Sequence, residues 1–168
     1  MTPDLVGRRV VLRRCLPEHH ERLRDIHLHP GVVRWWQLPE TEWPADEEPD
    51  THPCTVLVDD EVAGFVQWYA EGGEEFSRAG LDLFLDPARH GRGLGTEVVR
   101  LMCAYLVDER RYHRLVIDPE AVNTAAIACY AKAGFKPVGI LRKYSRDRHG
   151  EWHDGLLMDL LAAELIRD

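Results

Sequence analysis

The sequence has 168 residues, 45% of them hydrophobic, and a formal net charge of −8 at pH 7. The length suits one domain over residues 1–168, and this apolar content excludes a wholly disordered chain. The acidic total argues against nucleic-acid binding as the main activity, and no apolar run is long enough to span a membrane.

The first residues lack the charged-then-apolar order of a signal peptide. The four cysteines show no paired spacing, so we expect free thiols at Cys15, Cys54, Cys103 and Cys129. Free thiols fit a reducing compartment, and the sequence therefore predicts a cytoplasmic protein.

The first half of the chain is expected to begin with a strand at residues 9–14 and a helix from Pro17 to about residue 29. Five prolines and three tryptophans between Pro30 and Pro53 predict a loop with room for one short helical turn. Residues 55–58 and 62–69 then predict a β-hairpin.

The second half is expected to contain, in chain order, a strand at 80–86, a helix at 96–109, a strand at 115–118, a helix from Asn123 to Lys132, and strands at 138–145 and 152–160. Asn123 is a good N-cap for its helix, and Gly134 is the expected C-terminal stop. This order predicts one α/β domain with a mixed sheet.

Charge is unevenly distributed along the chain. The segment between Arg34 and Arg78 contains twelve acidic residues and no Lys or Arg, whereas basic residues are frequent from Arg89 onward. This division suggests a protein that holds a cation and an anion together. The alternative is that the acidic segment is simply a solvated surface.

A glycine-rich turn lies between the strand at 80–86 and the helix that follows it. Gly91, Gly93 and Gly95 alternate there, so the backbone can approach a ligand closely and the first N–H groups of the helix point outward. An anion is the natural ligand for such donors. Taken alone, the pattern is equally compatible with a plain tight turn.

The turn and the next helix together resemble the GNAT superfamily of N-acetyltransferases over about residues 79–136. The cofactor turn of that family, Gln/Arg-x-x-Gly-x-Gly/Ala, is matched by His90, Gly93 and Gly95, with His in place of the usual Gln or Arg. Its following helix, Asn-x-x-Ala-x-x-x-Tyr-x-x-x-Gly-Phe, is matched by Asn123, Ala126, Tyr130, Gly134 and Phe135.

The resemblance implies a GNAT fold, with flanking helices and a mixed, mostly antiparallel sheet that splays at an acetyl-CoA site. It implies cofactor contacts from three segments, namely Leu83, Phe84 and Leu85; His90, Gly91, Arg92, Gly93, Leu94, Gly95 and Thr96; and Asn123, Ala126, Tyr130 and Lys132. The pyrophosphate would lie on the turn, and the pantetheine arm would pair with the strand. A backbone N–H near Leu83 or Phe84 would polarise the thioester carbonyl.

Acetyl transfer to an amine needs a neutral amine and a proton for the departing thiolate. Tyr130 is the candidate proton donor, with packing in the core as the alternative role. Asp82 and Asp118 are the candidates for fixing a substrate ammonium and accepting its proton. Alternatively, Asp82 faces solvent and Asp118 caps the turn that follows it.

Within the superfamily, the sequence looks like the aminoglycoside 6′-N-acetyltransferases, which implies a cationic acceptor bound by Trp35, Trp36, Asp82 and Asp118. The two tryptophans could instead anchor their loop in the core. The C-terminal residues 139–159 resemble RimJ/RimL-like enzymes, which acetylate protein N-termini or small amines. A non-catalytic acyl-CoA sensor is the third possibility.

Nine histidines are present, including His19, His20, His27 and His29. They form no recognisable ligand set, so we expect exposed helix histidines and no metal site.

Overall fold

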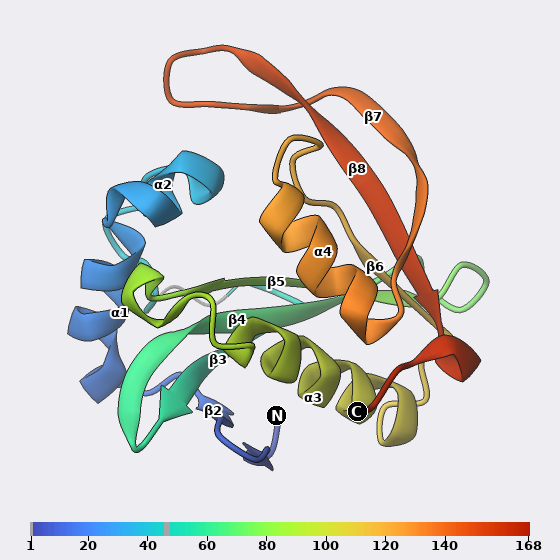
Figure 1. Cartoon of the computed structure of the whole chain (residues 1–168), viewed down its shortest axis with the longest axis horizontal. Coiled ribbons are helices and arrows are strands. Elements are labelled where there is room, and N and C mark those ends of the chain that lie inside the picture. Colours follow the sequence, from blue (N-terminus) through green and yellow to red (C-terminus); the bar gives the residue numbers. More distant parts are fainter. Residues whose placement is uncertain (1, 46–47) are drawn as a thin grey trace.

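The computed structural model describes residues 2–45 and 48–168. These residues form one eight-stranded sheet in the order β1-β2-β3-β4-β5-β6-β8-β7, surrounded by four α-helices (Figure 1). The strands are β1 (Leu5–Val6), β2 (Val11–Arg14), β3 (Thr51–Val58), β4 (Glu61–Glu71), β5 (Arg78–Leu85), β6 (Arg114–Ile117), β7 (Lys136–Arg146) and β8 (Trp152–Leu161). The helices are α1 (His20–His27), α2 (Pro30–Trp36), α3 (Leu94–Asp108) and α4 (Thr124–Ala133).

The sheet is mixed because β5 and β6 are parallel, whereas the other described neighbours pair antiparallel. This arrangement confirms the predicted fold class. All four cysteines are free, as expected.

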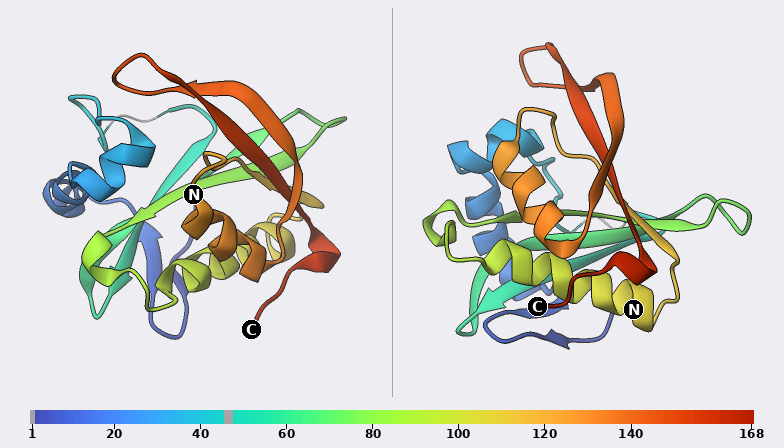
Figure 2. Two further views of the ribbon diagram at one scale, coloured as in Figure 1. Left: turned by 45° about the horizontal axis from the view of Figure 1, so that its top comes forward. Right: turned by 45° about the vertical axis from the view of Figure 1, so that its right-hand side comes forward.

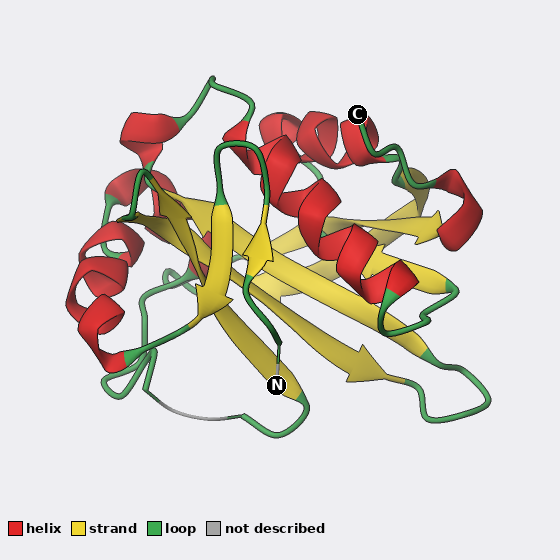
Figure 3. Cartoon of the chain, turned by 90° about the horizontal axis from the view of Figure 1, so that it is seen from below, coloured by secondary structure: helices red, strands yellow, loops and turns green. Residues whose placement is uncertain are grey.

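The two faces of the sheet carry separate apolar clusters. On one face, Val66 and Trp68 of β4 and Leu81 of β5 pack with α3 and α4 in the larger core. On the other face, Phe65 and Phe84 pack with apolar residues of α1 and α2. Alternation along each strand produces this division. Figure 3 shows α3 running along its face of the sheet, and Figure 2 shows the helices from two further directions.

β5 and β6 separate soon after they meet. Within the described residues, they pair at Ala79↔Leu115 and Gly80↔Val116, and residues 81–85 of β5 continue without a partner on that side. Because β5 remains paired with β4 up to Leu85, it keeps its extended form along the resulting gap. The predicted splay of the sheet is thus confirmed.

The β7–β8 hairpin reaches across the gap toward α2 (Figure 1). The side-chain amide of Gln37, directly after α2, donates a hydrogen bond to the carbonyl of Arg146 at the end of β7. Strands β7 and β8 therefore cover one side of the gap.

The short strand β1 was not predicted from the sequence, and most of the other predicted bounds shift by a few residues. Two elements differ more than this. The segment from Pro30 forms the regular helix α2 rather than an isolated turn, because Pro30 occupies the first helical position and the His29 side chain accepts from the Gly31 N–H. β3 begins at Thr51 rather than residue 55, since its first residues pair with β4. Among the residues described, no helix has both the length and the apolar character needed to cross a bilayer.

Gly134 ends α4 with a φ of 110°, and a Cβ at this position would lie 2.4 Å from the carbonyl oxygen of Glu164. Gly134→Ala should therefore lower the free energy of unfolding by about 2 kcal/mol or more, measured by chemical denaturation. Gly139→Ala is the matched control, because no atom lies within 4 Å of its added Cβ. Equal effects of the two substitutions would contradict this explanation.

Candidate active site

A cleft of about 1500 Å³ lies where β5 and β6 separate. Its walls come from β5, the glycine turn and the start of α3, α4, the end of α2, and the β7–β8 hairpin. With the exception of Arg92, every residue predicted from the sequence to bind cofactor or acceptor lines this cleft.

The glycine turn presents unused backbone donors to the cleft. Gly91 and Gly93 have φ angles of 74° and 75°, a conformation that glycine adopts without strain. Gly93 caps α3, and the first N–H group of the helix to find a backbone acceptor is that of Glu97, which donates to the Gly93 carbonyl. The earlier N–H groups and the helix dipole together favour a bound anion.

Side chains outside the cleft hold the turn in place. Arg9 donates to the Arg92 carbonyl at 2.6 Å and pairs with Glu97 of α3 at 2.9 Å. The exposed His90 donates from Nε2 to the Leu85 carbonyl at 3.2 Å, so it ties the turn to the end of β5. His90, which replaces the Gln or Arg usual in the family pattern, therefore helps to hold the turn in place.

The open edge of β5 carries the donors that a bound pantetheine arm would need. The Asp86 N–H donates to Ala63 of β4, and alternation along the ladder then turns the N–H of Phe84 toward β4 as well. The backbone N–H and C=O groups of Leu83 and Leu85 consequently point into the gap. Their carbonyls accept from Trp36 Nε1 at 3.2 Å and from His90, respectively. Of the two predicted oxyanion donors, the geometry favours Leu83.

Trp36 packs in the core, which was the alternative considered for it, and it also lies in the wall of the cleft. Its ring packs against the smaller core, at 5.0 Å from Phe84 between ring centroids, and it also lines the cleft. Trp35 is half-buried in the cleft wall, with the Arg34 guanidinium 4.6 Å from its ring centroid.

Tyr130 lies on α4, where it is buried and forms part of the lining of the cleft. The helix begins at Asn123, whose side chain accepts from the Ala126 N–H at 3.2 Å, as predicted for an N-cap. The Tyr130 hydroxyl makes no hydrogen bond to any residue that the structure describes. Burial raises its pKa, so it stays protonated at neutral pH and is available as a donor.

Asp82 projects from β5 into the cleft and does not face solvent. The Gln67 side chain on β4 donates to it at 3.3 Å. Burial raises the pKa of Asp82 to about 6, and the charges of Asp118 and Glu71 act in the same direction. A carboxylate with this pKa can accept a proton near neutral pH.

Asp118 follows β6 directly and faces the same cleft. Its side chain accepts a hydrogen bond from the hydroxyl of Tyr144 on β7, rather than from the turn after it. Burial raises the pKa of Asp118, and the Tyr144 hydrogen bond opposes that rise.

Three residues of the site were not identified from the sequence: Tyr69 and Tyr144, which line the cleft, and Gln67, which donates a hydrogen bond to Asp82. Gln67 and Tyr69 lie directly opposite Asp82 and Gly80 in the β4–β5 ladder, and the Tyr69 ring occupies the space that a side chain at position 80 would fill. Their alternation on β4 was visible in the sequence, but their partners depend on strand register.

The acidic segment of residues 40–75 contributes little to the negative charge of the cleft, apart from the charge of Glu71, which acts on Asp82 and Asp118. None of its described acidic residues lines the cleft, and Asp46 and Glu47 lie outside the described residues. The carboxylates that do line it are Asp82, Asp118, Glu120 and Asp147. The described acidic residues of this segment are all exposed, which fits the alternative interpretation of a solvated surface.

The expectation of exposed helix histidines was wrong for His19 and His27. Both are buried, because His19 bonds Thr55 Oγ1 at 2.9 Å and His27 packs 4.6 Å from Trp43 between ring centroids. His27 Nε2 donates to the Gln37 carbonyl at 3.0 Å.

Asp147, Glu151 and His153 bring potential metal ligands together at the hairpin turn. Asp147 accepts there from two backbone N–H groups and from His153, which accounts for the cluster as a turn. The absence of a metal site stays a prediction.

Comparisons with known proteins point to one family. The sequence profile of the acetyltransferase (GNAT) family matches residues 14–135. The chain is 32% identical over 150 residues to the Probable N-acetyltransferase YjcK of Bacillus subtilis, over 89% of this chain and 70% of that protein. It is 27% identical over 157 residues to aminoglycoside N(6′)-acetyltransferase type 1 of Klebsiella pneumoniae, over 81% of this chain and 76% of that protein.

A solved structure agrees with these relatives. The aminoglycoside acetyltransferase AAC(6′)-Ib in complex with coenzyme A and kanamycin superimposes with a TM-score of 0.73 at 26% identity, over 90% of this chain and 94% of that one. The resemblance of the C-terminal strands to RimJ/RimL-like enzymes stays a prediction.

The raised pKa of Asp82 means that its ionisation opposes folding. The cost is absent below the carboxyl's unfolded pKa near 4 and develops as pH rises through about 6. Asp82→Asn should therefore raise the free energy of unfolding by about 2 kcal/mol at pH 7.5 and leave it nearly unchanged at pH 4, measured by denaturation across pH. Asp25→Asn, on the exposed side of α1, is the control, and a difference independent of pH would contradict the assignment.

Proposed function

Because the chain belongs to the GNAT family of acetyltransferases, we propose that it moves the acetyl group of acetyl-CoA to a primary amine of a cationic acceptor, with an aminoglycoside 6′-amine as the preferred candidate. The observation that carries this proposal is the pair of carboxylates, Asp82 and Asp118, which face one cleft beside the open edge of β5.

The residues present fit acetyl-CoA. The turn of residues 91–96 offers backbone donors for the pyrophosphate, and no atom lies within 4 Å of the position that a Cβ on Gly91 would occupy. The edge of β5 at Leu83 and Leu85 offers peptide groups for the pantetheine arm. When bound, acetyl-CoA supplies a thioester, which is an activated acyl donor.

The chain's own residues then divide the proton chemistry. Asp118, with its ionised form stabilised by Tyr144, holds the incoming ammonium group of the acceptor. Asp82 accepts the ammonium proton, since its pKa of about 6 suits a base at neutral pH. The Leu83 N–H would serve as the oxyanion donor for a thioester bound along β5, and the Tyr130 hydroxyl would be the proton donor for the departing thiolate.

Two features support an aminoglycoside as the acceptor. Four carboxylates line the cleft, which suits a molecule with several ammonium groups. Trp35 and Trp36 lie along the same cleft and offer flat apolar surfaces for sugar rings. The similarity to aminoglycoside 6′-acetyltransferases adds a third argument, which is independent of the cleft itself.

The acceptor is tested by following release of the free CoA thiol with acetyl-CoA and a panel of aminoglycosides, polyamines and N-terminal peptides. We expect the highest kcat/KM with an aminoglycoside that carries a 6′-amine. Turnover of peptides or small polyamines alone would refute the aminoglycoside assignment and favour the RimJ/RimL-like alternative. Binding of acetyl-CoA without turnover of any acceptor would favour a sensor.

Tyr130→Phe tests the proton donor. It removes a hydroxyl that makes no hydrogen bond to any described residue, so packing should change little. We expect kcat to fall on the order of a hundredfold, while the affinity for acetyl-CoA, measured by calorimetry, changes less than about threefold. A parallel loss of both would indicate a packing role. Tyr112→Phe, against the core near Trp68 and outside the cleft, serves as the control.

A further inference from the structure

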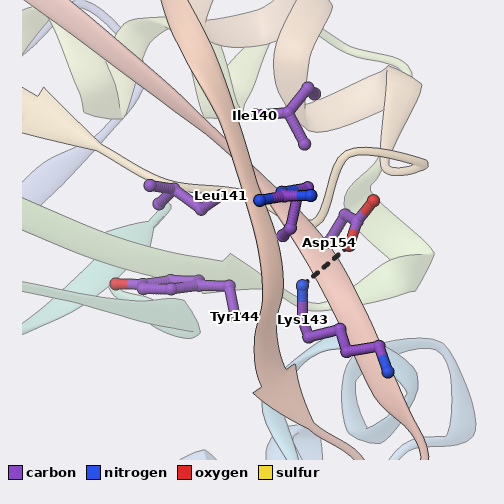
Figure 4. A pocket seen from close by; sticks show the side chains of 6 residues that line it. Ile140, Leu141, Lys143, Tyr144 and Asp154 are labelled. Atoms are coloured by element: carbon purple, nitrogen blue, oxygen red, sulfur yellow. Dashed lines mark hydrogen bonds between the residues drawn. The ribbon is translucent and has the colours of Figure 1, made fainter.

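β7 departs from regular pairing at the point where it passes over the cleft. Its register with β8 changes from Leu141↔Gly155 to Ser145↔His153, so residues 142–144 form a bulge. Lys143 within the bulge has a φ of 48°, a left-handed conformation that non-glycine residues rarely adopt. Its N–H is held by Asp154 Oδ1 on β8 at 2.8 Å (Figure 4).

The bulge redirects Tyr144. In Figure 4 the Tyr144 side chain extends to the opposite side from Lys143 and Asp154. Its ring passes over Gly155 of β8, where a Cβ would come within 2.9 Å of the ring carbon Cδ1. Its hydroxyl reaches Asp118 on the far side of the cleft and donates a hydrogen bond to it. Bulges beside active sites commonly re-aim a side chain in this way.

Packing does not account for this arrangement. Tyr144 is 49% exposed, so its ring adds little to the core. The left-handed residue costs free energy that a regular strand would avoid. The left-handed Lys143, the glycine at position 155 and the exposed ring of Tyr144 together place one hydroxyl against the half-buried carboxylate of Asp118.

From this geometry we propose that Tyr144 is a positioning residue for acetyl transfer. It fixes the orientation of the Asp118 carboxylate toward the acceptor and keeps that group in its ionised, acceptor-binding form. The role of Asp118 rests on the proposed function, whereas the coupling between Tyr144 and Asp118 does not.

The charges around Asp118 explain why it needs a donor. Asp82 of β5 and Glu71 of β4 face it with like charge. The charge of Asp118 also acts on the phenols of Tyr69 on β4, Tyr130 on α4 and Tyr144 on β7, and the first two make no hydrogen bond to it among the described residues. Glu120, Asp147 and His153 line the same cleft. Loss of the Tyr144 hydroxyl should therefore raise the pKa of Asp118.

The primary test needs no acceptor. The pKa of Asp118 is measured by carbon NMR of protein labelled at the aspartate carboxyls, with the signal assigned from Asp118→Asn. In Tyr144→Phe we expect this pKa to rise by roughly half a unit to one unit. Tyr105→Phe, buried on α3 outside the cleft, is the control and should leave it unchanged. An unchanged pKa in Tyr144→Phe overturns the proposal, whatever acceptor is found.

The kinetic test is a double-mutant cycle with the best acceptor of the panel. Tyr144→Phe should lower kcat/KM for the acceptor on the order of tenfold, move the acid limb of its pH profile upward, and leave the KM for acetyl-CoA unchanged. In the Asp118→Asn background the same substitution should have little further effect. An equal loss in both backgrounds would show that Tyr144 acts independently of Asp118 and would overturn the proposal. Absence of turnover by the native chain, with the NMR shift present, would contradict only the proposed function.

Discussion

β5 and β6 pair at Ala79↔Leu115 and Gly80↔Val116 and then diverge, and the rest of the site depends on this divergence. It leaves backbone groups of β5 in the middle of a sheet without a neighbouring strand, where an extended ligand can take the place of one. It also brings Asp118, which directly follows β6, to the mouth of the gap opposite Asp82. A cofactor groove and a pair of carboxylates thus arise from one interruption of the ladder.

The two carboxylates are similar in kind but differ in environment. Burial and the charge of Glu71 raise the pKa of both carboxyls, and the charge of Asp118 raises the pKa of Asp82 further. Asp118 has a phenol donor from Tyr144, whereas Asp82 has the longer contact from the Gln67 amide. Different environments can give two carboxyl groups different pKa values, so that they play different roles at the same pH. The proposed roles, charge-holding for Asp118 and proton-accepting for Asp82, rest on this asymmetry.

What could be predicted from the sequence was what depends on local chemistry. A cap at Asn123 and a stop at Gly134 each answer the needs of one helix end, and both are confirmed. The position of Gln67 beside Asp82 depends on strand register, which no local signal fixes. The inward direction of Tyr144 depends on a bulge, and the burial of His27 depends on rings contributed by distant segments. These features are set by the assembled fold.

The two walls of the cleft differ in how firmly they are joined to the rest of the protein. The cofactor wall consists of β5, α3 and α4, whose side chains belong to the main core. The acceptor wall consists of the short helix α2 and a hairpin whose outer strand exposes most of its residues to water. Substitutions in the acceptor wall consequently disturb little of the core. Such a division of labour lets the range of acceptors diverge over evolution while the acyl-donor machinery stays the same.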